Sequence, residues 1–125
     1  MIENEKVLRG VMTLLILGEL LEKPLHGYAL QNRVSEKLGT AIPPGTVYVL
    51  LGSLQKKGFV DILERKIVNG RKTTVYVITE NGKIFLIDHE EPLAIVRGVL
   101  DNLLDRIRKL GSLPGMDNLD SPRDR

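Results

Sequence analysis

The feature that most constrains the fold is the dipeptide Asn69-Gly70, which lies between two stretches rich in β-branched residues. Asn-Gly is the strongest short-range signal for a two-residue type I′ turn, because both turn positions need a positive φ. The stretches 59–68 and 73–78 are therefore predicted to form a β-hairpin. A chain of 125 residues can bury one modest core, so the hairpin is expected to belong to a single domain with at most one appended element.

The same turn sets the register of the two strands. It predicts four cross-strand pairs, namely Val68 with Arg71, Lys66 with Thr73, Glu64 with Val75 and Ile62 with Val77. In this register the base of the hairpin is apolar and its tip is basic. The tip is therefore expected to point away from the core.

Three helical segments precede the hairpin. Residues 7–22 are apolar on most sides, which predicts a helix covered by other elements around much of its circumference and ended by Pro24. Residues 28–38 have apolar side chains on one face, and Gly39 suits the carboxyl cap of such a helix. Residues 44–57 form the third predicted helix, which ends before the glycine that follows.

The third helix has a buried face and an outward face. Its apolar residues follow the i, i+3, i+4, i+7 spacing of a buried stripe, at Val47, Leu50, Leu51 and Leu54. Its other face is polar and basic with two small residues, and it carries Thr46, Tyr48, Val49, Gly52, Ser53, Lys56 and Lys57. Such a face fits a DNA major groove about 12 Å wide, because Gly52 and Ser53 let the backbone approach.

A further helical region follows the hairpin. Thr79 is expected to cap its start, and Pro92 to kink or restart it. Beyond the proline, a heptad seam of about two and a half repeats is formed by Leu93, Val96, Leu100, Leu103, Ile107 and Leu110. Such a stripe needs a partner, which is a second copy of the chain, the helix at residues 7–22, or both. Residues 111–125 lack periodicity and are expected to be disordered.

The charge of the chain is small but unevenly placed. The whole chain carries 18 Lys and Arg against 16 Asp and Glu, a net charge of +2. Between residues 56 and 72, six basic residues oppose two acidic ones, so this segment alone nets +4. The six are Lys56, Lys57, Arg65, Lys66, Arg71 and Lys72. Positive charge gathered at the end of the third helix and on the hairpin favours a phosphate-bearing partner.

Other classes of function have little support. The chain has no Cys, which excludes disulfides and thiolate metal sites and fits a reducing cytoplasm. Its longest apolar run is far shorter than the roughly 20 residues of a membrane span, and its acidic start is unlike a secretory signal. His26 and His89 have no nearby acidic residues at ligand spacing, so no metal site or cofactor is expected, and His26 is expected to cap the second helix. No phosphate loop, Gly-x-Ser-x-Gly elbow or His-Glu-x-x-His helix occurs, so an enzyme is not expected.

The order of three helices and a basic-tipped hairpin is that of a winged helix-turn-helix, a mostly helical α+β fold with a small β-hairpin. We predict a winged helix-turn-helix domain at residues 1–79, a carboxyl-terminal helical dimerisation segment at 80–110 and a tail at 111–125. The predicted partner is double-stranded DNA. A winged-helix module that binds a protein, or a chromatin-like protein that ignores DNA sequence, remain the alternatives.

Four segments resemble the PadR-like family of transcriptional regulators. They are His26-Gly27-Tyr28-Ala29-Leu30, Pro44-Gly45-Thr46-Val47-Tyr48-Val49-Leu50-Leu51, residues 54–60, and Gly70-Arg71-Lys72 leading into residues 75–82. The resemblance spans about residues 8 to 87. It implies a dimeric repressor with paired carboxyl-terminal helices. Two recognition helices about one helical turn apart predict a palindromic operator, and the lack of cysteine and of a secretory signal predicts a cytoplasmic protein.

The resemblance also implies which residues approach DNA. They are Thr46 and Tyr48 of the third helix, Tyr28 of the second, and Arg71 and Lys72 of the wing. With the residues that share these faces, the predicted contact set is Tyr28, Gln31, Gly45, Thr46, Tyr48, Ser53, Lys56, Lys57, Arg71 and Lys72. The predicted dimer interface is the heptad seam from Leu93 to Leu110.

Two departures from the family pattern stand out. Many relatives carry a basic residue near Gly52 and acidic residues near Lys56 and Lys57, so basic charge is placed differently here. Some relatives bind flat aromatic effectors through aromatic side chains, but this chain has no Trp and only two Phe. A small-molecule effector therefore stays unknown.

Overall fold

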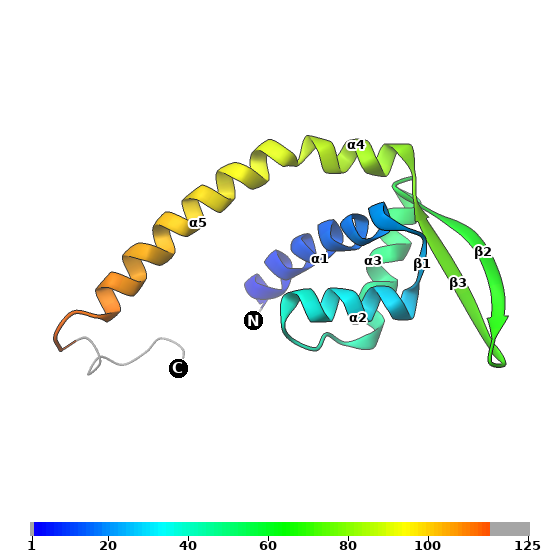
Figure 1. Cartoon of the computed structure of the whole chain (residues 1–125), viewed down its shortest axis with the longest axis horizontal. Coiled ribbons are helices and arrows are strands. Elements are labelled where there is room, and N and C mark those ends of the chain that lie inside the picture. Colours follow the sequence, from blue (N-terminus) through cyan, green and yellow to red (C-terminus); the bar gives the residue numbers. More distant parts are fainter. Residues whose placement is uncertain (1, 116–125) are drawn as a thin grey trace. The chain divides into compact units, whose positions relative to one another are not determined.

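A computed structural model describes residues 2–115, with side chains described from residue 7 onward. The fold is mostly helical with a small antiparallel sheet, as predicted, and it is a winged helix-turn-helix followed by a long helix (Figure 1). The elements in chain order are α1 (Ile2–Glu22), β1 (Leu25–His26), α2 (Gly27–Leu38), α3 (Pro44–Lys56), β2 (Val60–Val68), β3 (Arg71–Ile78), α4 (Glu80–Asp88) and α5 (Glu90–Gly111).

The helix ends follow local chemistry. The side chain of His26 caps α2, because its Nδ1 accepts a hydrogen bond of 3.2 Å from the backbone N–H of Ala29. Gly39 ends α2 in the left-handed conformation at φ 74°, which a glycine adopts without steric cost. Pro44 begins α3 at a first-turn position, where its missing N–H has no helical partner to lose. Both predicted caps of α2 are confirmed.

The core lies where α1, α2 and α3 pack together and against the sheet. α1 contacts α2, α3, α4 and β3. The fully buried side chains of the core come from α1, α2 and α3 and from the start of β2. They are Ile16, Leu17, Leu20, Leu30, Val34, Val47, Leu51 and Val60. The buried stripe predicted for α3 is confirmed, since Val47, Leu50, Leu51 and Leu54 are all buried. Val7, Leu8, Val11 and Leu21 of α1 are exposed, so α1 is covered over less of its circumference than expected.

One buried carboxylate joins α1 to α2. Glu19 is almost fully buried, and its two oxygens lie 2.9 Å from Lys37 Nζ and 3.2 Å from Arg33 Nη1. Arg33 also reaches Glu22 at 3.4 Å. The ammonium group of Lys37 lowers the pKa of the Glu19 carboxyl against the opposing effect of burial, and the same contact raises the pKa of Lys37.

The sheet has three strands in the order β1-β3-β2. Asn69 and Gly70 have φ of 51° and 78°, as the predicted type I′ turn requires. Three of the four predicted pairs are present, namely Val68 with Arg71, Lys66 with Thr73 and Glu64 with Val75.

The fourth pair is wrong, because Ile62 lies opposite Tyr76 and not Val77. A bulge between Ile62 and Glu64 adds one residue, Leu63, to β2 and shifts the register. The shift places Val60 opposite Ile78, and both of these side chains are buried. The core therefore sets the register at the base of the hairpin, and the turn sets it only near the tip.

The short strand β1 was not predicted. It pairs Leu25 with Tyr76 and His26 with Val75, so it lies on the side of β3 away from β2. A strand of two residues is too short to show the alternation of apolar and polar side chains by which strands are recognised in a sequence. The pairing nevertheless matters, because it fixes the start of α2 beside the hairpin.

The described chain divides into two compact units, of which the first ends at Asp88 and the second begins at His89. The predicted boundary after residue 79 lies one helix earlier. α4 belongs to the first unit because it packs on α1 and because Phe85 stacks on Phe59 at a ring distance of 4.6 Å. Thr79 caps α4 as predicted, since its hydroxyl accepts from the Gly82 N–H at 3.0 Å and donates to the Gly58 carbonyl at 2.6 Å.

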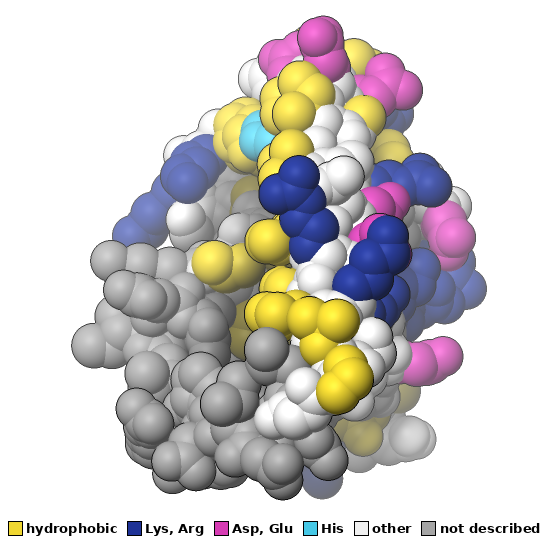
Figure 2. Space-filling view, turned by 90° about the vertical axis from the view of Figure 1, so that its left-hand side faces the viewer, with side chains coloured by type: hydrophobic (Ala, Val, Ile, Leu, Met, Phe, Trp, Pro, Cys, Tyr) yellow, Lys and Arg dark blue, Asp and Glu magenta, His cyan; other side chains and the backbone are white. Residues whose placement is uncertain are grey.

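The second unit contains α5. Helical structure restarts at Glu90, and Pro92 lies in the first turn, as expected. The six predicted seam residues are each 47–54% exposed, and no residue of α5 is buried. Figure 2 shows hydrophobic side chains in a band that runs down α5 beside Lys and Arg side chains. Residues 116–125, most of the tail predicted to be disordered, lie outside the described residues.

Candidate nucleic-acid interface

The outward side of α3 is set by its buried stripe. An α-helix has about 3.6 residues per turn, so the line opposite the stripe consists of Gly45, Val49, Gly52 and Lys56. All four are exposed. Tyr48 and Ser53 lie on either side of this line and are also exposed, whereas Thr46 is half-buried. The helix therefore presents a polar and mostly small surface, as the sequence predicts.

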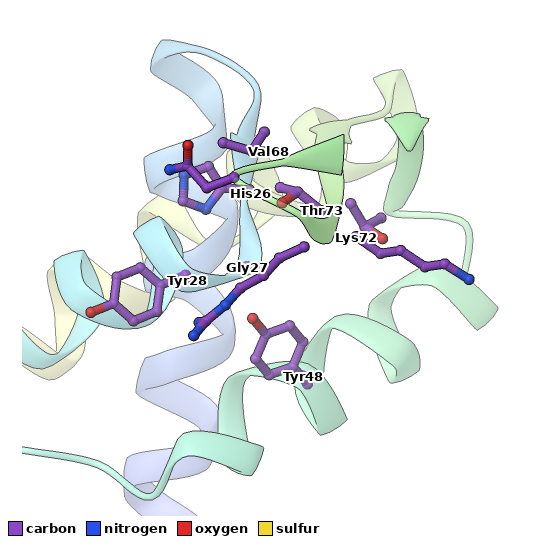
Figure 3. A pocket seen from close by; sticks show the side chains of 10 residues that line it. His26, Gly27, Tyr28, Tyr48, Val68, Lys72 and Thr73 are labelled. Atoms are coloured by element: carbon purple, nitrogen blue, oxygen red, sulfur yellow. The ribbon is translucent and has the colours of Figure 1, made fainter. Parts of the chain in front are cut away.

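Tyr48 lies against the first residue of α2. A side chain at the buried Gly27 would place its Cβ 2.8 Å from Tyr48 Cζ and 2.9 Å from the phenol oxygen. The missing side chain of Gly27 thus makes room for the Tyr48 ring. Figure 3 shows Tyr48 extending from α3 with its hydroxyl directed toward the start of α2 and the hairpin. Tyr48 as a residue is still 48% exposed, so part of it remains open to a partner.

An open hollow of about 650 Å³ lies between the start of α2, the Tyr48 ring and the hairpin (Figure 3). Of the ten predicted contact residues, Tyr28, Tyr48, Arg71 and Lys72 line it. Further lining residues were not predicted, and they are His26, Gly27, Val68, Asn69, Thr73 and Thr74. Only the pairing of β1 with β3 brings His26 beside the hairpin, and no sequence pattern signals that strand.

The remaining six predicted residues do not line the hollow. Gly45, Thr46, Ser53, Lys56 and Lys57 lie along α3 or at its end, and Gln31 lies one turn beyond Tyr28 on α2 and is half-buried. They therefore extend the candidate surface from the hollow along both helices.

Two tyrosines near the hollow have defined surroundings. Tyr28 is exposed and stacks on the His26 ring, with ring centres 6.5 Å apart and planes within 13°. Burial raises the pKa of Tyr76, and the nearby Tyr48 adds to that effect.

The cations of this surface are available to a partner. Within the part of the chain that the structure describes, Lys56, Lys57, Arg71 and Lys72 form no ion pair, although Lys66 lies 3.4 Å from Glu64. Cations without acidic neighbours are suited to phosphate groups, whose contacts give salt-dependent affinity. The described residues contain no group of three or more His, Asp or Glu side chains able to hold a metal ion. No described helix is long and apolar enough to cross a bilayer.

The sequence model of the transcriptional regulator PadR-like family matches residues 16–88, which include every element from the middle of α1 to the end of α4. The chain belongs to the PadR-like family. Members of this family are transcriptional regulators with a winged-helix DNA-binding fold, so this PadR-like protein is a DNA-binding regulator.

Solved structures agree with this membership. A Thermoplasma acidophilum protein assigned as a transcriptional regulator is 42% identical, with a TM-score of 0.71 over 81% of this chain and 95% of that one. A PadR-like regulator of Bacillus cereus is 27% identical, with a TM-score of 0.68 over 79% of this chain and 96% of that one. A PadR family regulator of Clostridium difficile is 23% identical and shares the fold, with a TM-score of 0.64 over 74% and 97% of the two chains.

Proposed function

We propose that this PadR-like protein is a cytoplasmic, homodimeric repressor that binds a palindromic DNA operator in a sequence-specific manner. The observation that carries the proposal is the placement of Tyr48 of α3 and the wing cations Arg71 and Lys72 around one open hollow. Neither cation forms an ion pair within the described part of the chain. α3 occupies the major groove, and the wing contacts phosphates or the minor groove beside it.

Each predicted residue then has a definite task. Gly45, Thr46, Ser53 and Lys56 lie on the part of α3 that faces the bases and the groove walls. Tyr28, Gln31 and Tyr48 approach the sugar-phosphate backbone next to the hollow, and Lys57, Arg71 and Lys72 contact phosphates. Contacts to phosphates position the protein, and contacts to base edges select the sequence.

The dimer is proposed from the exposed face of α5. Nine large apolar side chains of this helix are exposed, and they are Leu93, Ile95, Val96, Val99, Leu100, Leu103, Leu104, Ile107 and Leu110. A continuous apolar surface of this kind is typical of an interface between subunits. A symmetric dimer presents two recognition helices about one helical turn of DNA apart, which is why a palindrome is expected.

The test begins with selection of bound duplexes from a random DNA pool. The selected duplex and a scrambled duplex are then titrated at several salt concentrations. We expect a palindromic winner that binds about a thousandfold more tightly than the scrambled control, with affinity that falls steeply as salt rises.

The other outcomes are equally informative. Equal binding to both duplexes would support a protein that ignores sequence. Absence of binding to either would support the protein-interaction module. Repression itself is tested by transcription in vitro from a promoter that overlaps the selected site, where added protein should lower the yield of transcript.

A further inference from the structure

The outermost line of α3 has an unusual composition. Gly45, Val49, Gly52 and Lys56 follow the spacing 4, 3, 4, directly opposite the buried stripe. Two of these four positions have no side chain, and Lys56 lies in the last turn. Val49 therefore provides the one apolar side chain on the line, and it is 59% exposed.

The fold does not explain the glycine at position 52. Gly52 lies within α3, a Cβ added there would meet nothing within 4 Å, and its φ is not in the left-handed region. Glycine destabilises the interior of a helix relative to alanine, so nothing within the domain favours it at this position. Its effect is to leave Val49 without a bulky neighbour one turn further along the outward line.

The fold does not explain Val49 either. An exposed β-branched residue has a lower helix propensity than alanine, and Val49 is not among the residues of the buried core or those packed against it. The valine side chain has neither a hydrogen-bond donor nor an acceptor, so it cannot hydrogen-bond to a phosphate or to the polar edge of a base. The apolar group that a major groove offers is the C5-methyl group of thymine.

We propose that Val49 reads a thymine by packing against its C5-methyl group, with Gly52 allowing the helix to come close enough for this contact. The inference rests on the proposed function, because it requires α3 to lie in the major groove of a specific site. It adds a specificity-determining residue, Val49, on the outward line of α3 between Tyr48 on one side and Ser53 on the other.

The experiment removes the methyl group from the DNA alone. In the operator selected by the wild-type protein, each thymine is replaced in turn, at symmetric positions of the two half-sites, by deoxyuridine. The wild-type protein should lose about fourfold in affinity per half-site at one symmetric pair of thymines, which is the effect of burying one methyl-sized group. The other thymines serve as internal controls.

The same titrations with Val49→Ala complete a double-mutant cycle. We expect this variant to bind the normal operator more weakly and to show no further loss when deoxyuridine occupies the sensitive pair. Gln55→Ala is the matched control, because Gln55 is exposed on α3 but lies off the outward line. That variant should keep the full penalty for deoxyuridine.

Two results would overturn the assignment of Val49 and leave the proposed function intact. In one, the wild-type protein binds every deoxyuridine operator as tightly as the normal one. In the other, the penalty persists in Val49→Ala, so that another residue reads the methyl group. Failure of the wild-type protein to prefer any sequence would instead overturn the proposed function and this inference together. Thermal melting of each variant confirms that it is folded before it is titrated.

Discussion

At the scale of single residues, the absence of a side chain at Gly27 of α2 lets the Tyr48 ring of α3 pack against the start of α2. In Gly27→Ala the new methyl group would overlap the Tyr48 ring, so the ring has to move away from the start of α2. We expect operator affinity to fall by about tenfold to a hundredfold, the effect of losing one hydrogen bond to a charged group. Titration of the operator measures this loss.

The control for this variant is Gly18→Ala, because a side chain at Gly18 of α1 meets nothing within 4 Å. Alanine is the better helix former, so this change should raise the melting temperature slightly and leave operator affinity unchanged. If Gly27→Ala binds the operator as tightly as wild type, the position of the Tyr48 ring has no part in DNA binding.

Glu19 gives a prediction about pH. Its pKa is lowered in the folded protein, mainly by the hydrogen bond from Lys37, so its ionisation stabilises the fold at neutral pH. This contribution is complete above the ordinary pKa of a glutamate and is lost as the pH falls through the lowered value in the folded state. Glu19→Gln should therefore cost about 1–3 kcal/mol at pH 7, and the difference from wild type should shrink as the solution is acidified.

Denaturant unfolding of both proteins across the acidic range measures this difference. Glu80→Gln is a suitable control, because Glu80 is highly exposed and pairs with Lys83 on the surface of α4. Exposed pairs of this kind contribute little. A difference between wild type and Glu19→Gln that stays constant with pH would show that packing, and not charge, accounts for the effect.

At the scale of elements, the wing is proposed to contact DNA through its two exposed cations. Arg71→Ala and Lys72→Ala each remove one exposed cation that has no acidic partner among the described residues. Each should weaken binding to the operator and to scrambled DNA by a similar factor. Each should also reduce the slope of log affinity against log salt by about 1 for every phosphate that the variant no longer binds.

The comparison for the wing is Lys83→Ala on α4, which removes a cation that is paired with Glu80. Its salt slope should equal that of the wild type. A decrease in affinity confined to the operator, with scrambled DNA unaffected, would assign Arg71 or Lys72 to the reading of bases. Fluorescence titrations at four or five salt concentrations give both the factor and the slope.

The hairpin and its surroundings also show what the sequence can predict. The turn at Asn69-Gly70, the caps at His26 and Gly39 and the buried stripe of α3 depend on neighbouring residues, so local patterns predict them. The bulge at Leu63 depends on where the distant core places Val60 and Ile78. Local patterns cannot include that constraint.

The residues of the candidate site likewise fall into those that local patterns predict and those that depend on tertiary contacts. Its tyrosines and wing cations follow from motifs and charge, and four of them line the hollow. The contribution of His26 depends on the two-residue strand β1, whose pairing with β3 is a tertiary contact. The place of Tyr48 depends equally on Gly27, because the ring occupies the space of an absent side chain on another helix.

At the scale of the whole molecule, the proposed dimer through α5 would determine whether one domain or two bind the operator. A single winged helix reads one half-site, whereas a dimer reads both half-sites within one binding event. Leu103 lies in the middle of the exposed apolar face of α5. In a dimer held by this face, Leu103→Glu places two carboxylates in an apolar seam, at a cost that a short interface of about two and a half heptads cannot offset.

Leu103→Glu should therefore be a monomer by analytical ultracentrifugation, and it should lose at least about a hundredfold in affinity for the full palindrome while keeping its weak affinity for a single half-site. Asp101→Lys is the control, since Asp101 lies on the polar face of the same helix. It should remain a dimer with wild-type affinity. A dimeric Leu103→Glu would place the subunit interface on another surface, and the exposed apolar residues of α1, Val7, Leu8 and Val11, would be the first to test by the same substitution.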